Sequence, residues 1–220
     1  MPVSSPPAAE RLAPPVAEER RAGPADRRAE TQPVQPEAER RRHQRRRAPR
    51  PIDPTPIGFA DAQKELASIS DREDIARIVL RFAAGKFRRA LLLNIQRDTA
   101  IGWLGAGAGL DPRVVPKVAL SLKKASAFKL VRDSRSHYLG PLRRDFPTVV
   151  FLRSLGGGEP RTALLMPLLA AGRVVNILYV DGGPERFTPP DVGELLILAQ
   201  RVGRSFEAMI AARRHAVARA

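Results

Sequence analysis

Apolar and polar positions divide the chain into two parts of different character. The first part, residues 1–58, has no apolar period and contains 12 of the 21 prolines. Such a segment buries too little apolar surface to offset the entropy that is lost on ordering. We therefore predict a disordered tail over residues 1–58. Residues 59–220 are predicted to form one domain, long enough for a single well-buried core.

Two helices are predicted at the start of the domain. The shorter helix places its apolar residues on one face: Phe59, Ala62, Leu66 and Ile69. The second begins at a capping box, Ser70-x-x-Glu73, and ends before Gly85, a residue type that often terminates helices. Its apolar residues also recur at helical spacing: Ile75, Ile78, Val79 and Phe82.

A long helix is predicted at the carboxyl end of the chain. Its start is marked by Thr188-x-x-Asp191, with two prolines in the first turn. One apolar stripe follows: Val192, Leu195, Leu196, Ala199, Val202, Phe206, Met209 and Ile210. A single stripe covers one surface only. It packs on the domain's own sheet, or its distal residues, Met209 and Ile210, pair with a second copy of the chain in a homodimer.

Two β-hairpins are predicted between these helices. In the first, strands at 89–96 and 100–106 flank a turn at 97–99. In the second, apolar strands between residues 162 and 181 flank Ala170-Ala171-Gly172. Because Pro167 has no amide hydrogen to donate, its strand needs a bulge or an open edge at that position.

The middle of the domain is less regular. We expect a strand near 117–122 and a helix near 127–132, within a basic segment that continues to residue 144. With the two hairpins and the flanking helices, this predicts an α/β protein of the α+β type. Its sheet is mostly antiparallel and has helices packed on it.

Composition excludes several kinds of chemistry. The chain has no cysteine, and so no disulfide, thiol nucleophile or cysteine-based metal site. No stretch resembles a signal peptide or reaches the about 18 apolar residues of a membrane span. We therefore expect a cytoplasmic protein with no transmembrane segment. The lack of cysteine fits a reducing compartment.

The formal net charge of +15 is spread over both parts of the chain. The tail has 12 arginines against 8 acids, whereas the domain has 26 Lys and Arg against 15 acids. Seven arginines gather in the tail: Arg40, Arg41, Arg42, Arg45, Arg46, Arg47 and Arg50. This cluster makes nonspecific contact with a polyanion, or it is a solvated linker. No aromatic residue lies between the arginines to stack on bases, which favours the linker.

Two stretches near the carboxyl end form one continuous pattern. Residues 165–181 read LMPLLAAGRVVNILYVD, and residues 187–199 read FTPPDVGELLILA. An apolar-Pro-Leu strand, a short turn and a second apolar strand are followed by Phe, Asp and a helix with paired leucines. This pattern resembles the carboxyl-terminal half of the GAF domain family. The resemblance extends over about residues 62–212. It implies a GAF-like sensory or interaction module.

The chemistry-bearing residues do not indicate an enzyme. GAF-like proteins that attach a bilin, and the GAF-fold methionine sulfoxide reductases, need cysteines that this chain lacks, and the Asn-Lys pair of cyclic-nucleotide-binding members is absent. No triad or metal spacing surrounds His137 or His215. The glycine-rich run 102–109 lacks the spacing of a phosphate-binding loop and is expected to form a flexible connection that leaves the second strand. We therefore expect no catalytic residues, metal or cofactor.

In the family, small ligands lie between the sheet and the variable middle segment. The aromatic residues available to line such a site are Trp103, Phe128, Tyr138 and Phe151. For Trp103, the only tryptophan, packing under a helix is the favoured alternative. Asn176 stands where many members have a small glycine. It is a structural polar residue, faces solvent or contacts a ligand.

Basic residues of the middle segment give the site a positive rim, or else form a solvated face. They are Lys123, Lys124, Lys129, Arg132, Arg135, Arg143 and Arg144. A positive rim favours an anion or an acidic partner. The sequence thus predicts a non-enzymatic regulatory module that acts through ligand sensing, protein contact or both, with unidentified protein partners. The alternatives are a binder of nucleic acid or anionic surfaces led by residues 40–50 and, least favoured, an enzyme on this fold.

Overall fold

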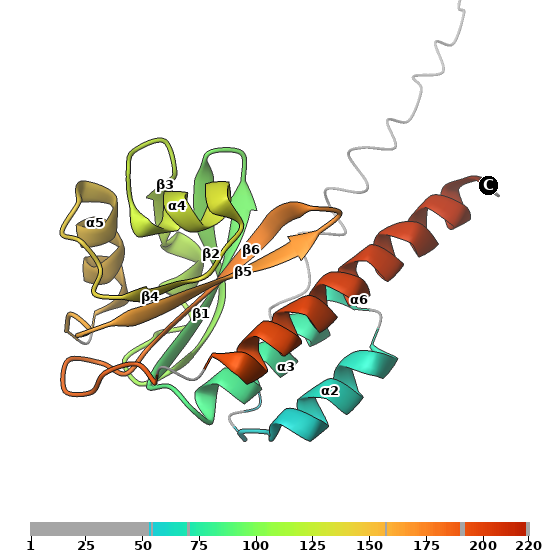
Figure 1. Cartoon of the computed structure of the whole chain (residues 1–220), viewed down its shortest axis with the longest axis horizontal. Helices are drawn as coiled ribbons and strands as arrows, with labels where there is room; N and C mark the ends of the chain where they lie inside the picture. Colours follow the sequence, from blue (N-terminus) through green and yellow to red (C-terminus); the bar gives the residue numbers. More distant parts are fainter. Residues whose placement is uncertain (1–52, 54, 70, 157, 190–191, 219–220) are drawn as a thin grey trace, which may run out of the picture. The chain divides into compact units, whose positions relative to one another are not determined.

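A six-stranded antiparallel sheet separates two groups of helices (Figure 1). The computed structural model describes residues 53, 55–69, 71–156, 158–189 and 192–218, all within one compact unit, Arg50–Ala220. The strand order is β3-β2-β1-β6-β5-β4, which confirms the predicted mostly antiparallel sheet. Residues 1–52 of the predicted tail lie outside the described residues. Among the described helices, none is both long and apolar enough to cross a membrane.

The first hairpin joins β1 (Arg89–Gln96) to β2 (Thr99–Gly107), close to the predicted bounds. The strands meet at a two-residue turn, where Arg97 has a φ of 54°. Gly102 lies within β2 and faces the short helix η1 (Val115–Lys117). A Cβ added at Gly102 would lie 1.9 Å from the carbonyl oxygen of Val115. Residues 102–106 of the glycine-rich run thus belong to the strand predicted at 100–106, which packs under a turn, and only residues 108–109 of the run follow β2.

The second hairpin joins β5 (Ala163–Ala170) to β6 (Arg173–Asp181), as predicted. On its other side β5 pairs with β4 (Tyr138–Gly140), whose three residues reach only as far as Leu165. Pro167 thus lies at an open edge, and the register shifts between Leu168 and Leu169. The open edge leaves no ladder hydrogen bond that Pro167 would have to donate, as predicted, and a bulge lies close to it.

Three helices cover one face of the sheet: α2 (Phe59–Ser68), α3 (Arg72–Ala84) and α6 (Gly193–Ala218). Their apolar faces share one core with alternate residues of β1, β5 and β6. Contact between α6 and β5 is close at Gly203, where an added Cβ would lie 2.7 Å from the carbonyl oxygen of Leu169. The inner face of α6 therefore packs on the domain's own sheet.

The starts of two helices differ from the prediction. Asp71, not Ser70, caps α3: its carboxylate accepts hydrogen bonds from the amides of Glu73 and Asp74 at 2.8 and 3.3 Å. Thr188 does not cap α6, which begins at Gly193. Its hydroxyl instead donates to the carbonyl of Thr162 at 2.8 Å. Ser70 and Asp191 themselves lie outside the described residues.

The opposite face of the sheet carries α4 (Ala127–Ser134) and α5 (Phe146–Leu155) (Figure 1). The helix expected near 127–132 is confirmed as α4. The strand expected near 117–122 is confirmed as the short β3 (Ala119–Ser121). Neither β4 nor α5 was predicted.

Residues just upstream of α2 contact α3. The Nε of Arg81 donates to the carbonyl of Thr55 at 3.0 Å, and its Nη2 lies 3.7 Å from a carboxylate oxygen of Asp53. Ile57 packs against the helical core. The sequence suggested that the domain begins at residue 59, but these contacts show that the packed part of the chain begins upstream of it.

Candidate functional site

The space between the sheet and the helices α4 and α5 is filled by aromatic rings. Phe128 of α4, Phe151 of α5 and Tyr179 of β6 are fully buried there. The ring centroid of Phe151 lies 4.8 Å from that of Phe128 and 4.9 Å from that of Tyr179, both in edge-to-face geometry. Such contacts stabilise a packed core. Phe128 and Phe151, which we predicted to line a ligand site, thus lie together inside a closed cluster.

A buried ion pair closes the sheet end next to this cluster. Arg89, the first residue of β1, donates from Nε to Asp181, the last residue of β6, at 2.8 and 3.1 Å. Its other nitrogens donate to the carbonyls of Gly156 and Gly158 at 2.6 and 3.1 Å. One side chain therefore holds the loop that follows α5 against the sheet.

Asp181 has further donors around it. The amide of Gly183 donates to Oδ1 at 2.6 Å, and the hydroxyl of Tyr179 donates to Oδ2. Burial raises the pKa of Tyr179 well above its usual value of 10.0, and the negative charge of Asp181 raises it further. The tyrosine is therefore a neutral donor, and the network is part of the domain's framework.

Trp103 lies on the other face of the sheet, against the core of α2, α3 and α6. The guanidinium carbon of Arg72 is 4.3 Å from its ring centroid, and Arg72 also donates to Oδ1 of Asn94 at 2.8 Å. Burial lowers the pKa of the Arg72 guanidinium, and the nearby charge of Arg213 lowers it further. Trp103 therefore packs under helices, the alternative that the sequence favoured, and the sheet lies between it and the cluster of Phe128 and Phe151.

Asn176 is fully buried in β6, so the solvent-facing alternative is wrong. Its Nδ2 donates to the carbonyl of Leu93 at 3.3 Å across the β1–β6 pair. Among the described residues, no donor reaches its Oδ1. The observed contact is that of a structural polar residue.

Tyr138 borders a depression of about 540 Å³ on the outer side of α4 and the amino end of α5. Its hydroxyl donates to the carbonyl of Pro141 at 2.6 Å. Leu130, Arg143, Arg144 and Asp145 also line the depression. The carboxylate of Asp145 caps α5 by accepting from the amide of Thr148 at 2.9 Å.

Three of the predicted basic residues are bound to acids. Arg132 binds Asp98 at 2.9 Å, Arg132 and Lys129 both bind Asp133, and Arg144 binds Glu159 at 2.8 Å. The hydrogen bond that Arg132 donates to the Asp133 carboxylate is the main cause that raises the pKa of Arg132. Lys123 and Lys124 follow β3, and the ammonium nitrogen of Lys124 lies 5.2 Å from the ring centroid of Phe146. The arginines at 40–47 lie outside the described residues.

Sequence reasoning missed the apolar side chains of this surface. Leu130, Phe146 and Val150 are 55%, 72% and 38% exposed. A usable signal was present in the sequence: Asp145 followed by Phe-Pro is an N-cap with proline in the first turn. In the part of the chain that the structure describes, no group of three His, Asp or Glu side chains is placed to hold a metal ion.

Comparisons with known proteins identify the fold. No family model and no curated protein matches the chain. A methyl-accepting chemotaxis protein, residues 122 to 287, matches with a TM-score of 0.56 and 15% identity, over 70% of this chain and 98% of that one. The GAF domain of a phosphoenolpyruvate-protein phosphotransferase from Coxiella burnetii matches with a TM-score of 0.56 and 16% identity, over 73% and 94%.

An enzyme has a similar structure. The free methionine-R-sulfoxide reductase from Neisseria meningitidis, solved in complex with its substrate, matches with a TM-score of 0.52 and 14% identity, over 70% of this chain and 89% of that one. At such identities the likeness concerns the fold. The described domain of this chain has a GAF-like fold.

Proposed function

We propose that this chain is a non-enzymatic regulatory module that acts through contact with other proteins. The observation that carries the proposal is the filled interior behind α4 and α5, where Phe128, Phe151 and Tyr179 leave no exposed surface. A small molecule bound between the sheet and these helices would have to displace packed aromatic rings. Recognition at the protein surface needs no such rearrangement.

The similar structures support a modular role. Two of them, residues 122 to 287 of a methyl-accepting chemotaxis protein and the GAF domain of a phosphotransferase, are parts of larger proteins. A domain of this kind works together with other polypeptide segments.

The likeness to the sulfoxide reductase does not favour an enzyme. This chain has no cysteine, so a thiol-dependent reaction would have no nucleophile. Asp181 accepts hydrogen bonds from both Tyr179 and Arg89, and all three side chains are buried, which favours a structural role for them.

The proposal is tested with the purified full-length chain. We immobilise the chain and expect it to capture at least one protein from an extract of the native host in a saturable manner. The same chain after heat denaturation is the control and should capture none. We expect native mass spectrometry to detect the polypeptide without a bound small molecule. A stoichiometric small molecule would transfer the role to ligand sensing, and the lack of any saturable partner would contradict the proposal.

Polyanion contact through residues 40–50 is a second candidate. It is favoured by seven arginines in eleven positions, and it lies outside the described residues. Replacing these arginines with serine should flatten the salt dependence of polyanion binding, because fewer counterions are then released. An unchanged dependence would place the contact on the domain.

A further inference from the structure

The outer faces of α4 and α5 carry a patch of exposed apolar side chains. Phe146 and Val150 are four residues apart and lie on one face of α5. Leu130 of α4 lines the depression of about 540 Å³ that also reaches Asp145, the residue before Phe146. Exposed apolar side chains that gather on neighbouring elements mark binding surfaces.

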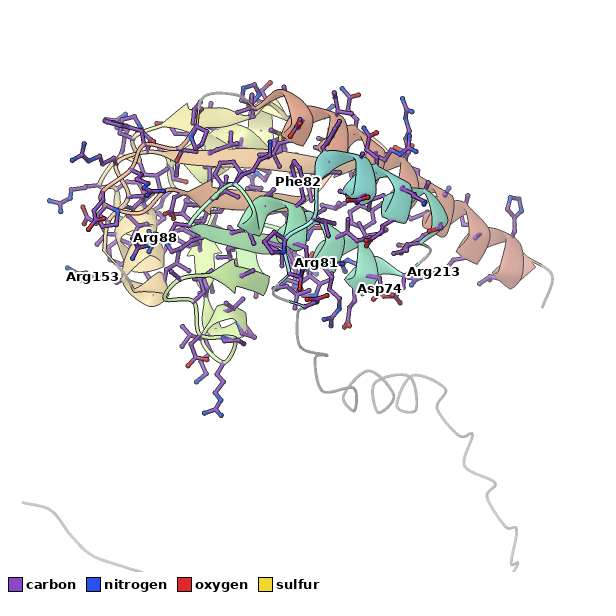
Figure 2. All side chains as sticks on the ribbon, turned by 90° about the horizontal axis from the view of Figure 1, so that it is seen from below. Asp74, Arg81, Phe82, Arg88, Arg153 and Arg213 are labelled. Atoms are coloured by element: carbon purple, nitrogen blue, oxygen red, sulfur yellow. The ribbon has the colours of Figure 1, made fainter. Side chains whose placement is uncertain are left out.

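Cations surround this patch. Lys124 lies over the ring of Phe146, and Arg143 and Arg144 line the depression. Arg153 follows Val150 on the same face of α5 and points away from the domain (Figure 2).

The acids near the patch are already engaged. Glu159 is bound by Arg144 at 2.8 Å, and the carboxylate of Asp145 accepts the amide of Thr148. Asp133 binds Lys129 and Arg132. The amide hydrogen bond leaves the negative charge of Asp145 in place, but the cations Lys124, Arg143 and Arg153 outnumber it, so the rim of the patch carries a net positive charge.

We infer that the α4–α5 surface, defined by Leu130, Phe146 and Val150 with the rim cations Lys124, Arg143 and Arg153, binds an acidic segment of a partner protein that carries apolar side chains. The inference rests on the proposed function and names the surface and the chemistry of the partner. Its basis is charge complementarity: a positive rim steers and orients an acidic partner. The apolar centre supplies the contact area that is removed from water.

The geometry indicates how such a segment lies. One apolar side chain of the partner enters the depression beside Leu130 and Tyr138. A second packs on Phe146 and Val150, while carboxylates approach Lys124, Arg143 and Arg153. A nucleic acid would use the cations but would leave Leu130 and Val150 without an apolar partner, so a protein segment fits the surface better.

The test uses the full-length chain and a synthetic peptide of glutamates with leucine or phenylalanine at every third or fourth position. We expect the peptide to bind with a dissociation constant on the order of 100 µM by calorimetry. The double variant Leu130→Ser/Phe146→Ser should weaken binding at least tenfold. The matched control, Phe187→Ser/Ile197→Ser, removes two exposed apolar side chains elsewhere and should leave the affinity unchanged.

Three results would overturn the inference. The first is no binding of the peptide to the wild type at millimolar concentration, and the second is binding of polyglutamate as tight as that of the apolar peptide. The third is binding of an RNA oligonucleotide that depends on Lys124 and Arg143 but not on Leu130 and Phe146. Thermal unfolding of both double variants, measured beside the wild type, establishes that affinity changes occur in folded protein.

The proposed binding surface and the proposed function can be disproved independently. A captured partner that binds Leu130→Ser/Phe146→Ser as tightly as wild type removes the α4–α5 surface but leaves protein contact as the function. If no partner is captured while the peptide binds in the expected variant-dependent manner, the surface stands and the proposed regulatory role does not.

Discussion

The Nε of Arg89 lies 2.8 Å from Oδ2 of Asp181, and the two side chains are 1% and 0% exposed. They are register partners on the adjacent strands β1 and β6. The same guanidinium holds the carbonyls of Gly156 and Gly158. Each buried charge is compensated by the other. The loss of either side chain therefore leaves an uncompensated charge in the interior.

We expect Arg89→Met to lower the free energy of unfolding by about 3–5 kcal/mol, because Asp181 then remains buried without its cation. The double variant Arg89→Met/Asp181→Asn should cost less than the sum of the single variants. Urea unfolding at neutral pH measures both effects. Arg144→Met, which breaks an exposed pair with Glu159, serves as control and should cost at most about 1 kcal/mol. Equal losses for Arg89→Met and the control would contradict a structural role.

Tyr179 makes stability depend on alkaline pH. Its pKa in the folded protein is raised well above 10.0, chiefly by burial and then by Asp181. Below pH 10 the hydroxyl is protonated in both states, and its stabilising contribution is fully present. As the pH rises above 10, the unfolded chain releases this proton while the folded chain retains it, so stability falls by up to about 1.4 kcal/mol per pH unit.

Tyr179→Phe should therefore be less stable than wild type at neutral pH, by about 1–2 kcal/mol, because Asp181 loses a donor. The difference should shrink as the pH rises above 10. Urea unfolding at several alkaline pH values measures it. Tyr138→Phe removes the other tyrosine hydroxyl and should leave the alkaline loss of stability in place. A constant difference between Tyr179→Phe and wild type at all pH values would show that Tyr179 does not titrate as stated.

The strands and hairpins with a clear local pattern of apolar and turn residues were predicted correctly. β1 was predicted residue by residue, and the β5–β6 hairpin with its edge at Pro167 followed from apolar runs around Ala171-Gly172. α5 was missed because apolar residues occur on almost every side of its short sequence, FPTVVFLRSL. Such a run has no clear helical period. β4 has three residues, too few for an alternation to be visible.

The candidate site depended on long-range placement. Residue type alone does not determine which face of a sheet a side chain occupies. The sequence favoured packing of Trp103 under a helix, but it did not show that Phe128 and Phe151 lie on the opposite face. Arg89 reads in the sequence as one more surface cation, and its partner Asp181 is 92 positions away. The basic residues of the α4 region were predicted as a group, but which of them face acids followed only from packing.

Gly203 permits the close approach of α6 to β5. An alanine elsewhere in a helix stabilises it by about 1 kcal/mol relative to glycine. Here the added Cβ would meet the carbonyl oxygen of Leu169 at 2.7 Å, so α6 or β5 must shift. We expect Gly203→Ala to lower the free energy of unfolding by about 1–3 kcal/mol. Urea unfolding gives the sign directly, and a stabilised variant would show that the helix is free to move away.

The amino-terminal boundary of the folded domain is tested by truncation. A chain that starts at Asp53 retains the contacts of Asp53, Thr55 and Ile57 with α3 and the core. It should match the stability of the full chain. A chain that starts at Phe59 should lose about 1–2 kcal/mol, from one charged hydrogen bond and part of one apolar side chain. A truncation at 53 that unfolds would mean that residues 1–52 contribute to folding.

The packing of α6 limits which of its apolar residues are available to form a homodimer. Leu195, Leu198, Val202 and Phe206 are buried in the domain's own core, and Met209 packs partly against it. Ile210 and Val217 remain exposed. They are seven residues apart and thus lie on one face of the distal helix, the spacing by which paired helices meet.

We expect the full-length chain to dimerise at high micromolar concentration through this distal face. Ile210→Glu/Val217→Glu should then give a folded monomer in light scattering, with thermal stability unchanged at matched concentration, because neither side chain belongs to the core. Ile197→Glu, an exposed apolar residue on the proximal part of α6, is the control and should remain dimeric. A wild-type chain that is monomeric at this concentration would contradict the prediction of a dimer. A double variant that unfolds would show that Ile210 and Val217 stabilise α6 itself.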